Sequence, residues 1–67
     1  MVETRYVVSA EFIEYTNNDC WDLVRHDLYE CKDREKAEKI AKDLKEKEFY
    51  KGESISNVAV RERWCRL

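Results

Sequence analysis

Residues 33–44, with the sequence DREKAEKIAKDL, decide the fold class because they predict the one helix of this chain. Asp33 is a natural N-cap, since its side chain can accept a hydrogen bond from an early backbone N–H of the helix. The apolar residues follow the i, i+3, i+4, i+7 spacing of a single core-facing stripe: Ala37, Ile40, Ala41 and Leu44. Gly52 is the expected C-terminal stop, so the helix is predicted over residues 33–51.

Three strands are predicted around this helix, over residues 5–15, 20–31 and 55–65, because these stretches are rich in β-branched and aromatic residues. In the second strand the alternation breaks near His26 and Asp27, which indicates a β-bulge. The order of elements is β-β-α-β, and a right-handed crossover favours a sheet in the order 2-1-3. We therefore predict one α+β domain over residues 1–67, a ββαβ unit with a three-stranded sheet and one helix packed on one face.

The strands carry large apolar side chains on both faces, whereas one helix can cover only one of them. The covered face should supply the core, which we expect to contain Val8, Ala10, Phe12, Ile40, Leu44, Val58 and Val60. The other face then leaves these residues in need of cover: Val7, Ile13, Tyr15 and either Trp21 or Leu28. Domains of this length bury only about 60% of their unfolded surface and usually need a partner or a staple. We expect a homodimer, formed by stacked open faces or by pairing at the edge of the third strand.

The net charge of −2 hides an asymmetry between the two halves of the chain, in which 42% of the residues are charged. Residues 1–31 carry seven acidic residues against Arg5 and Arg25, whereas residues 32–67 carry eight acidic and eleven basic residues. An acidic half can attract a basic partner if its charges share a face after folding. The alternative is that the hairpin needs charged residues only for solubility.

No motif in the chain dictates a chemistry. The residue types that could bind zinc are Cys20, Cys31, Cys65 and the lone His26, but they do not have the spacing of zinc knuckles. The three cysteines are instead expected to be small, buried or half-buried thiols. An odd separation places His26 and Cys31 on opposite faces of one strand unless a bulge intervenes, which disfavours a Cys–His nucleophile. The single glycine leaves no Gly-rich phosphate loop. We expect no enzymatic activity, no cofactor and no metal.

The location expected for the protein is the cytoplasm. Three cysteines leave at least one unpaired, and the chain shows no N-terminal apolar run. No stretch approaches the ~20 apolar residues that a membrane helix needs.

The function expected from these features is protein binding, with occlusion of a partner's surface. The partner-binding residues are aromatic anchors, one aliphatic residue of the open face and acidic residues that steer a basic partner: Tyr15, Trp21, Tyr29, Trp64, Ile13, Glu11, Glu14, Asp19 and Asp22. The alternative is a single-stranded nucleic-acid binder that uses the same aromatic residues with the C-terminal basic segment of Arg61, Arg63, Trp64 and Arg66. The acidic hairpin argues against this alternative.

Residues 29–44, YECKDREKAEKIAKDL, resemble the strand-to-helix junction of many very small ββαβ proteins, which are similar to accessory proteins of bacteriophages and mobile elements. Some of these proteins act by binding a host protein, and they include inhibitors of CRISPR and other defence systems. The resemblance implies an accessory protein that binds and occludes a host protein in the host cytoplasm, such as the basic surface of a nucleic-acid-binding protein. It lies at the level of architecture and assigns no role to a single residue.

Overall fold

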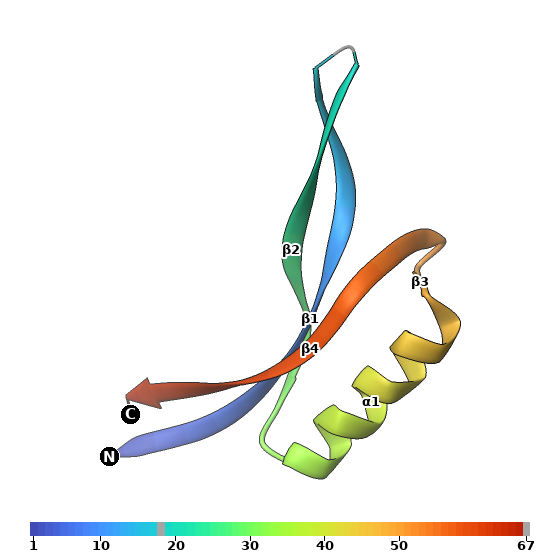
Figure 1. Ribbon diagram of the computed structural model, residues 1–67. Coiled ribbons are helices and arrows are strands. Elements are labelled where there is room, and N and C mark those ends of the chain that lie inside the picture. Colours follow the sequence, from blue (N-terminus) through green and yellow to red (C-terminus); the bar gives the residue numbers. More distant parts are fainter. Residues whose placement is uncertain (18, 67) are drawn as a thin grey trace.

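The computed structural model describes residues 1–17 and 19–66 and contains one helix and four strands. In chain order these are β1 (Val2–Asn17), β2 (Cys20–Cys31), α1 (Arg34–Lys47), β3 (Phe49–Tyr50) and β4 (Glu53–Arg66). The chain is a small α+β domain in which α1 lies on one side of the sheet and the two termini lie side by side (Figure 1). The turn expected between the first two strands includes Asn18, which lies outside the described residues.

The predicted three-stranded sheet is wrong, because the sheet has four antiparallel strands in the order β2-β1-β4-β3. The added strand β3 occupies residues that we expected in the last turn of the helix. The helix ends earlier because Glu48 adopts a left-handed conformation (φ 59°) and its N–H bonds to the carbonyl of Leu44. Gly52 does not stop the helix. With Lys51 it forms the two-residue turn between β3 and β4, where both residues have positive φ.

The start of α1 confirms the predicted cap. The side chain of Asp33 accepts a hydrogen bond of 3.0 Å from the backbone N–H of Glu35. On the solvent side, Asp43 and Lys47 form an i,i+4 ion pair at 3.0 Å, as expected for these spacings. Glu38 forms a second i,i+4 pair, with Arg34, at 3.1 Å.

The core lies between α1 and the even-numbered face of β1. Buried residues of the helix pack against buried residues of β1 and β4, and together they form one cluster: Ala37, Ala41, Leu44, Val8, Ala10, Phe12, Ile55 and Val58. Ile40 and Val60, which we expected in this core, are half-buried at its margin. Burial of such apolar surface is the main source of stability for the fold.

Two β-bulges adjust which side chains face the helix. In β2, Tyr29 opposes Val8 and Asp27 opposes Ser9, so Leu28 is the extra residue, close to the predicted bulge at residues 26 and 27. In β4, Ala59 opposes Ser9 and Ser56 opposes Glu11, which leaves two residues against Ala10. One of these two, Asn57, has a φ of 49°. This bulge changes the alternation of β4, so that Ile55 and Val58 both reach the core.

The far end of the β1–β2 hairpin extends beyond the rest of the domain (Figure 1). We call this part the hairpin arm and define it as residues 13–17 and 19–23. The pairing of β1 with β4 ends at Phe12, so only the pairing with β2 continues along the arm. The domain is accordingly long and narrow, with principal extents of 47 × 26 × 16 Å.

Removing the Leu44 side chain tests the core. We expect Leu44→Ala to lower the free energy of unfolding by about 2–5 kcal/mol, because a buried leucine is replaced by a cavity between helix and sheet. Urea unfolding followed by circular dichroism measures the change. The exposed Lys42→Ala on the same helix serves as the control, and equal effects of the two substitutions would contradict this core.

Candidate protein-binding site

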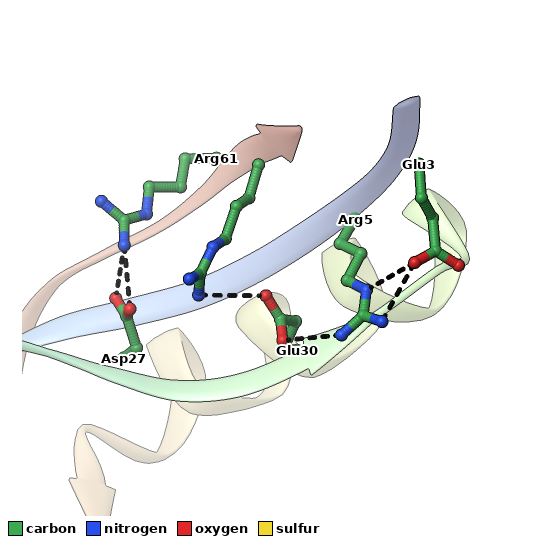
Figure 2. A network of polar contacts seen from close by, with 6 residues as sticks. Glu3, Arg5, Asp27, Glu30 and Arg61 are labelled. Atoms are coloured by element: carbon green, nitrogen blue, oxygen red, sulfur yellow. Dashed lines mark hydrogen bonds and ion pairs between the residues drawn. The ribbon is translucent and has the colours of Figure 1, made fainter. Parts of the chain in front are cut away.

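The sheet face opposite the helix is covered by ion pairs over its central part (Figure 2). Arg5 contacts Glu3 at 3.0 Å and Glu30 at 3.4 Å, and the other carboxylate oxygen of Glu30 contacts Arg63 at 3.4 Å. Lys32 adds a further contact to Glu3. Residues from β1, β2 and β4 are thereby joined by one connected network of opposite charges.

Two further arginines extend this polar cover towards the arm. Arg61 contacts both carboxylate oxygens of Asp27, at 3.0 and 2.8 Å. Arg25 donates to the hydroxyl of Ser9 at 2.9 Å and to Glu11 at 3.0 Å. The stems of such long side chains cover apolar surface while their charged ends stay in water.

The ion-pair cover explains why Val7 does not need a second subunit. Val7 is 1% exposed and Ser9 is 2% exposed, although both lie on the face without a helix. The expectation that Val7 requires cover from a partner is therefore wrong. An interface formed by stacking the whole open face has no apolar centre at this point.

The hairpin arm carries the exposed apolar side chains of this face. The register places Ile13 opposite Leu23 and Tyr15 opposite Trp21, so the four side chains lie on one side of the two strands. We call these four residues the apolar strip. Their exposed fractions are 52% for Ile13, 80% for Tyr15, 60% for Trp21 and 41% for Leu23. An exposed cluster of this kind is typical of an interaction surface.

The four acidic residues predicted to steer a partner do not share one face. Glu11 is on the side of the strip, where it is bound by Arg25 and by the side-chain amide of Asn57. Glu14 and Asp22 oppose each other on the reverse side of the arm, where Glu14 lies 2.7 Å from a ring nitrogen of His26. Asp19 is exposed in the turn at the end of the arm. The arm thus has an apolar side and an acidic side.

Two of the predicted anchors lie away from the arm. Tyr29 is half-buried on the helix side of the sheet, where the ammonium of Lys36 is 5.9 Å from its ring centroid. Trp64 opposes Thr4 near the termini and is 72% exposed. Of the four aromatic anchors, only Tyr15 and Trp21 are brought together.

The structure also separates the residues of the nucleic-acid alternative. Arg61 and Arg63 lie on the open face, and each is paired with a carboxylate. Trp64 and Arg66 alternate to the other face of β4. A phosphate backbone would have to displace Asp27 and Glu30 before it could bind the first two arginines.

Sequence reasoning missed Leu23 as a member of the candidate site. Its signal was the register of the hairpin, since a short turn that pairs Tyr15 with Trp21 also pairs Ile13 with Leu23. The sequence also places Leu23 on the same side of the second strand as Trp21, although Arg25 and Asp27 interrupt the apolar alternation further along. The interruption is real, and it marks where the arm ends and the ion-pair cover begins.

The cysteines and His26 lie at separate places. Cys20 is exposed in the arm, Cys31 and Cys65 are half-buried, and all three are free thiols. Among residues 1–17 and 19–66, no group of three or more His, Cys, Asp or Glu side chains could hold a metal ion. In the same part of the chain, no helix has both the length and the apolar character needed to cross a membrane.

Comparisons with protein-family models, with curated proteins and with solved structures found no match to this chain. The resemblance of residues 29–44 to accessory proteins of phages therefore stays a prediction. The function is therefore inferred from the geometry of the arm and of its surroundings.

The network on the open face predicts a weaker fold in acid. Hydrogen bonds from Lys32 and from Arg5 hold the pKa of Glu3 below its ordinary value of 4.5. The stability that Glu3 contributes is therefore complete above that ordinary pKa, and it is lost as the pH falls through the lower pKa of the folded state. We expect the free energy of unfolding, measured in urea from about pH 7 to about pH 3, to fall less steeply in Glu3→Gln than in the wild type.

Glu46→Gln, at an exposed position of the helix, is the control for this measurement and should follow the wild type. If the free energy of unfolding of Glu3→Gln falls with decreasing pH as steeply as that of the wild type, a stabilising role for this carboxylate is contradicted.

Proposed function

We propose that this chain is a non-enzymatic protein-binding module that works as a homodimer, joined through the apolar strips of two hairpin arms. The observation that carries the proposal is the grouping of Ile13, Tyr15, Trp21 and Leu23 on one exposed side of the arm. Trp and Tyr are frequent anchors of interfaces because they bring a large contact area with few rotatable bonds.

The construction of the arm supports a partner at this place. A two-stranded hairpin is at best marginally stable in water when nothing covers it. Beyond Phe12 the arm consists of β1 and β2 alone, since β4 pairs with β1 only up to that residue. A second copy packed against the strip would supply the second layer that the arm lacks.

The size of the strip fits an interface between two copies. A buried Tyr or Trp can contribute about 150–250 Å², so two aromatic and two aliphatic side chains reach the scale of several hundred Å² on each subunit. Stable interfaces bury about 800 Å² per partner. A single self-complementary patch packs on its own copy about a two-fold axis, which closes the assembly as a dimer.

The acidic side of the arm remains in solvent in this dimer. Glu14 and Asp22 lie on the reverse side from the strip, so their charges do not meet across the contact. Contact is limited to the arms, and the ion-pair cover of Arg5, Glu30 and Arg63 stays intact. This arrangement replaces the stacking of whole open faces that we expected from the sequence.

Light scattering across a dilution series tests the dimer. We expect the wild type to have twice the chain mass of 8.2 kDa at high concentration. Trp21→Glu should raise the dissociation constant at least ~100-fold, because it places a charge in the apolar centre of the contact. Trp64→Glu is the matched control, since Trp64 is also exposed (72%, against 60% for Trp21) but lies near the termini, and it should leave the dimer unchanged.

Circular dichroism establishes that each variant is folded, and Tyr15→Glu is the second arm variant if Trp21→Glu does not fold. A wild type that remains a monomer up to about 1 mM, or a dimer that both tryptophan variants weaken equally, would refute the proposal.

A further inference from the structure

A groove separates α1 from β2 on the helix side of the sheet. It consists of two adjoining hollows of about 540 and 530 Å³, which share Leu28 and Tyr50. One hollow lies at the base of the arm beside Phe12 and His26, and the other lies between β2 and the helix. We call the two together the helix-side groove. Their size is that of pockets that hold peptide side chains or small ligands.

The groove has an apolar floor with lysines at its rim. The floor includes half-buried and buried apolar or aromatic residues of the sheet and the helix: Phe12, Leu28, Tyr29, Ile40, Leu44 and Tyr50. Lys36 lies over the ring of Tyr29 at 5.9 Å, and Lys51 lies over the ring of Tyr50 at 5.4 Å. Lys39 lines the hollow next to the helix. The Tyr29 hydroxyl raises the pKa of Lys36, so this ammonium stays charged.

These lysines share with Lys42 and Lys45, which line another part of the helix, the absence of an ion pair among the described residues. Arginines of the described residues are paired with carboxylates at five positions: Arg5, Arg25, Arg34, Arg61 and Arg63. In the same part of the chain no ion pair includes Lys36, Lys39 or Lys51. Three carboxylates line the groove. Asp43 is bound by Lys47 and Glu14 by His26, whereas Glu53, in the same hollow as Lys51, is in no ion pair of the described residues.

The wall formed by β2 is an edge of the sheet. β2 pairs only with β1 among the described strands, so its outer backbone N–H and C=O groups have no partner strand. Extended peptides bind such edges by adding a strand, with alternate side chains entering pockets beside it. The bulge at Leu28 bends this edge where the two hollows meet.

We propose that the helix-side groove binds an extended acidic segment of a partner protein. Apolar side chains of the segment would enter the two hollows beside Leu28, while its carboxylates meet Lys36 and Lys39, and its backbone would pair with the outer edge of β2. The unpaired lysines beside an apolar floor select this chemistry, because a basic segment would be repelled at the same rim. The partner thus differs from the basic protein expected from the acidic hairpin. This inference rests on the proposed function in one respect, that the chain is a protein-binding module. It does not depend on the proposed dimer.

Two synthetic octapeptides are the probes for this site, one of alternating leucine and glutamate and one of alternating leucine and lysine. We expect the glutamate peptide to shift backbone amide resonances of residues 26–31 in β2 and of residues 36–44 in α1. The lysine peptide should bind at least ~10-fold more weakly, since it lacks carboxylates for the rim. Added salt should weaken the glutamate peptide, because part of its affinity is electrostatic.

A pair of double variants with equal charge provides the control. Lys36→Glu with Lys39→Glu should reduce the affinity for the glutamate peptide at least ~10-fold and improve that for the lysine peptide. Lys42→Glu with Lys45→Glu changes the net charge by the same amount, at a part of the helix that lines another hollow, away from β2. This control should leave the preference for the glutamate peptide over the lysine peptide unchanged. Equal effects of the two double variants would overturn the proposal.

The arm variant Trp21→Glu separates this inference from the proposed dimer, because it should keep the affinity for the glutamate peptide. Loss of peptide binding in Trp21→Glu, or shifts confined to the arm, would refute the groove as the site and leave the dimer test unaffected. Groove resonances that move with protein concentration alone would assign the groove to a second copy, which also overturns the proposal.

Discussion

The packing of one helical stripe on the sheet is the constraint from which the other surfaces follow. Ala37 and Ala41 of α1 are buried in one cluster with Val8 and Ala10 of β1. A helix with one narrow stripe covers one part of one face. The opposite face, the hairpin arm and the margin along β2 are therefore left without a helix. Ion pairs cover the opposite face, whereas the arm and the margin along β2 leave apolar side chains accessible. The first region therefore serves the fold, and the other two are the candidates for interaction.

On the opposite face, charge replaces apolar cover. Exposed ion pairs are individually weak, at about 0–1 kcal/mol. Here they matter because they hold long arginine side chains over the sheet. Arg61 and Arg63 reach from β4 to Asp27 and Glu30 of β2, across the central strand that carries Val7. Their side chains close this face to water without forming an apolar surface that would attract other proteins. The same face becomes apolar only beyond Arg25, where the arm begins.

The helix was the most predictable element, because the cap at Asp33 and the stripe that ends at Leu44 are local patterns. Its end was not predictable from Gly52, since a left-handed Glu48 is permitted by the tertiary structure rather than favoured by its residue type. The strip was partly predictable from Ile13, Tyr15 and Trp21. The cover over Val7 was not, because it depends on arginines that are up to 56 residues away in the sequence and meet only through the sheet register.

The distribution of arginine and lysine distinguishes the two proposed interaction surfaces. Arginine binds carboxylates through a planar group with several donors, and here four arginines use it for contacts within the sheet: Arg5, Arg25, Arg61 and Arg63. Lysine holds a single, strongly hydrated charge on a flexible stem. At the groove, no ion pair of the described residues includes Lys36 or Lys39. An acidic segment would have to displace a bound carboxylate at each of the five paired arginines but none at Lys36 or Lys39. The proposed dimer would depend on apolar contact at the arm, where Ile13 also lines one hollow of the groove, whereas the proposed acidic partner would meet Lys36 and Lys39 at the other hollow.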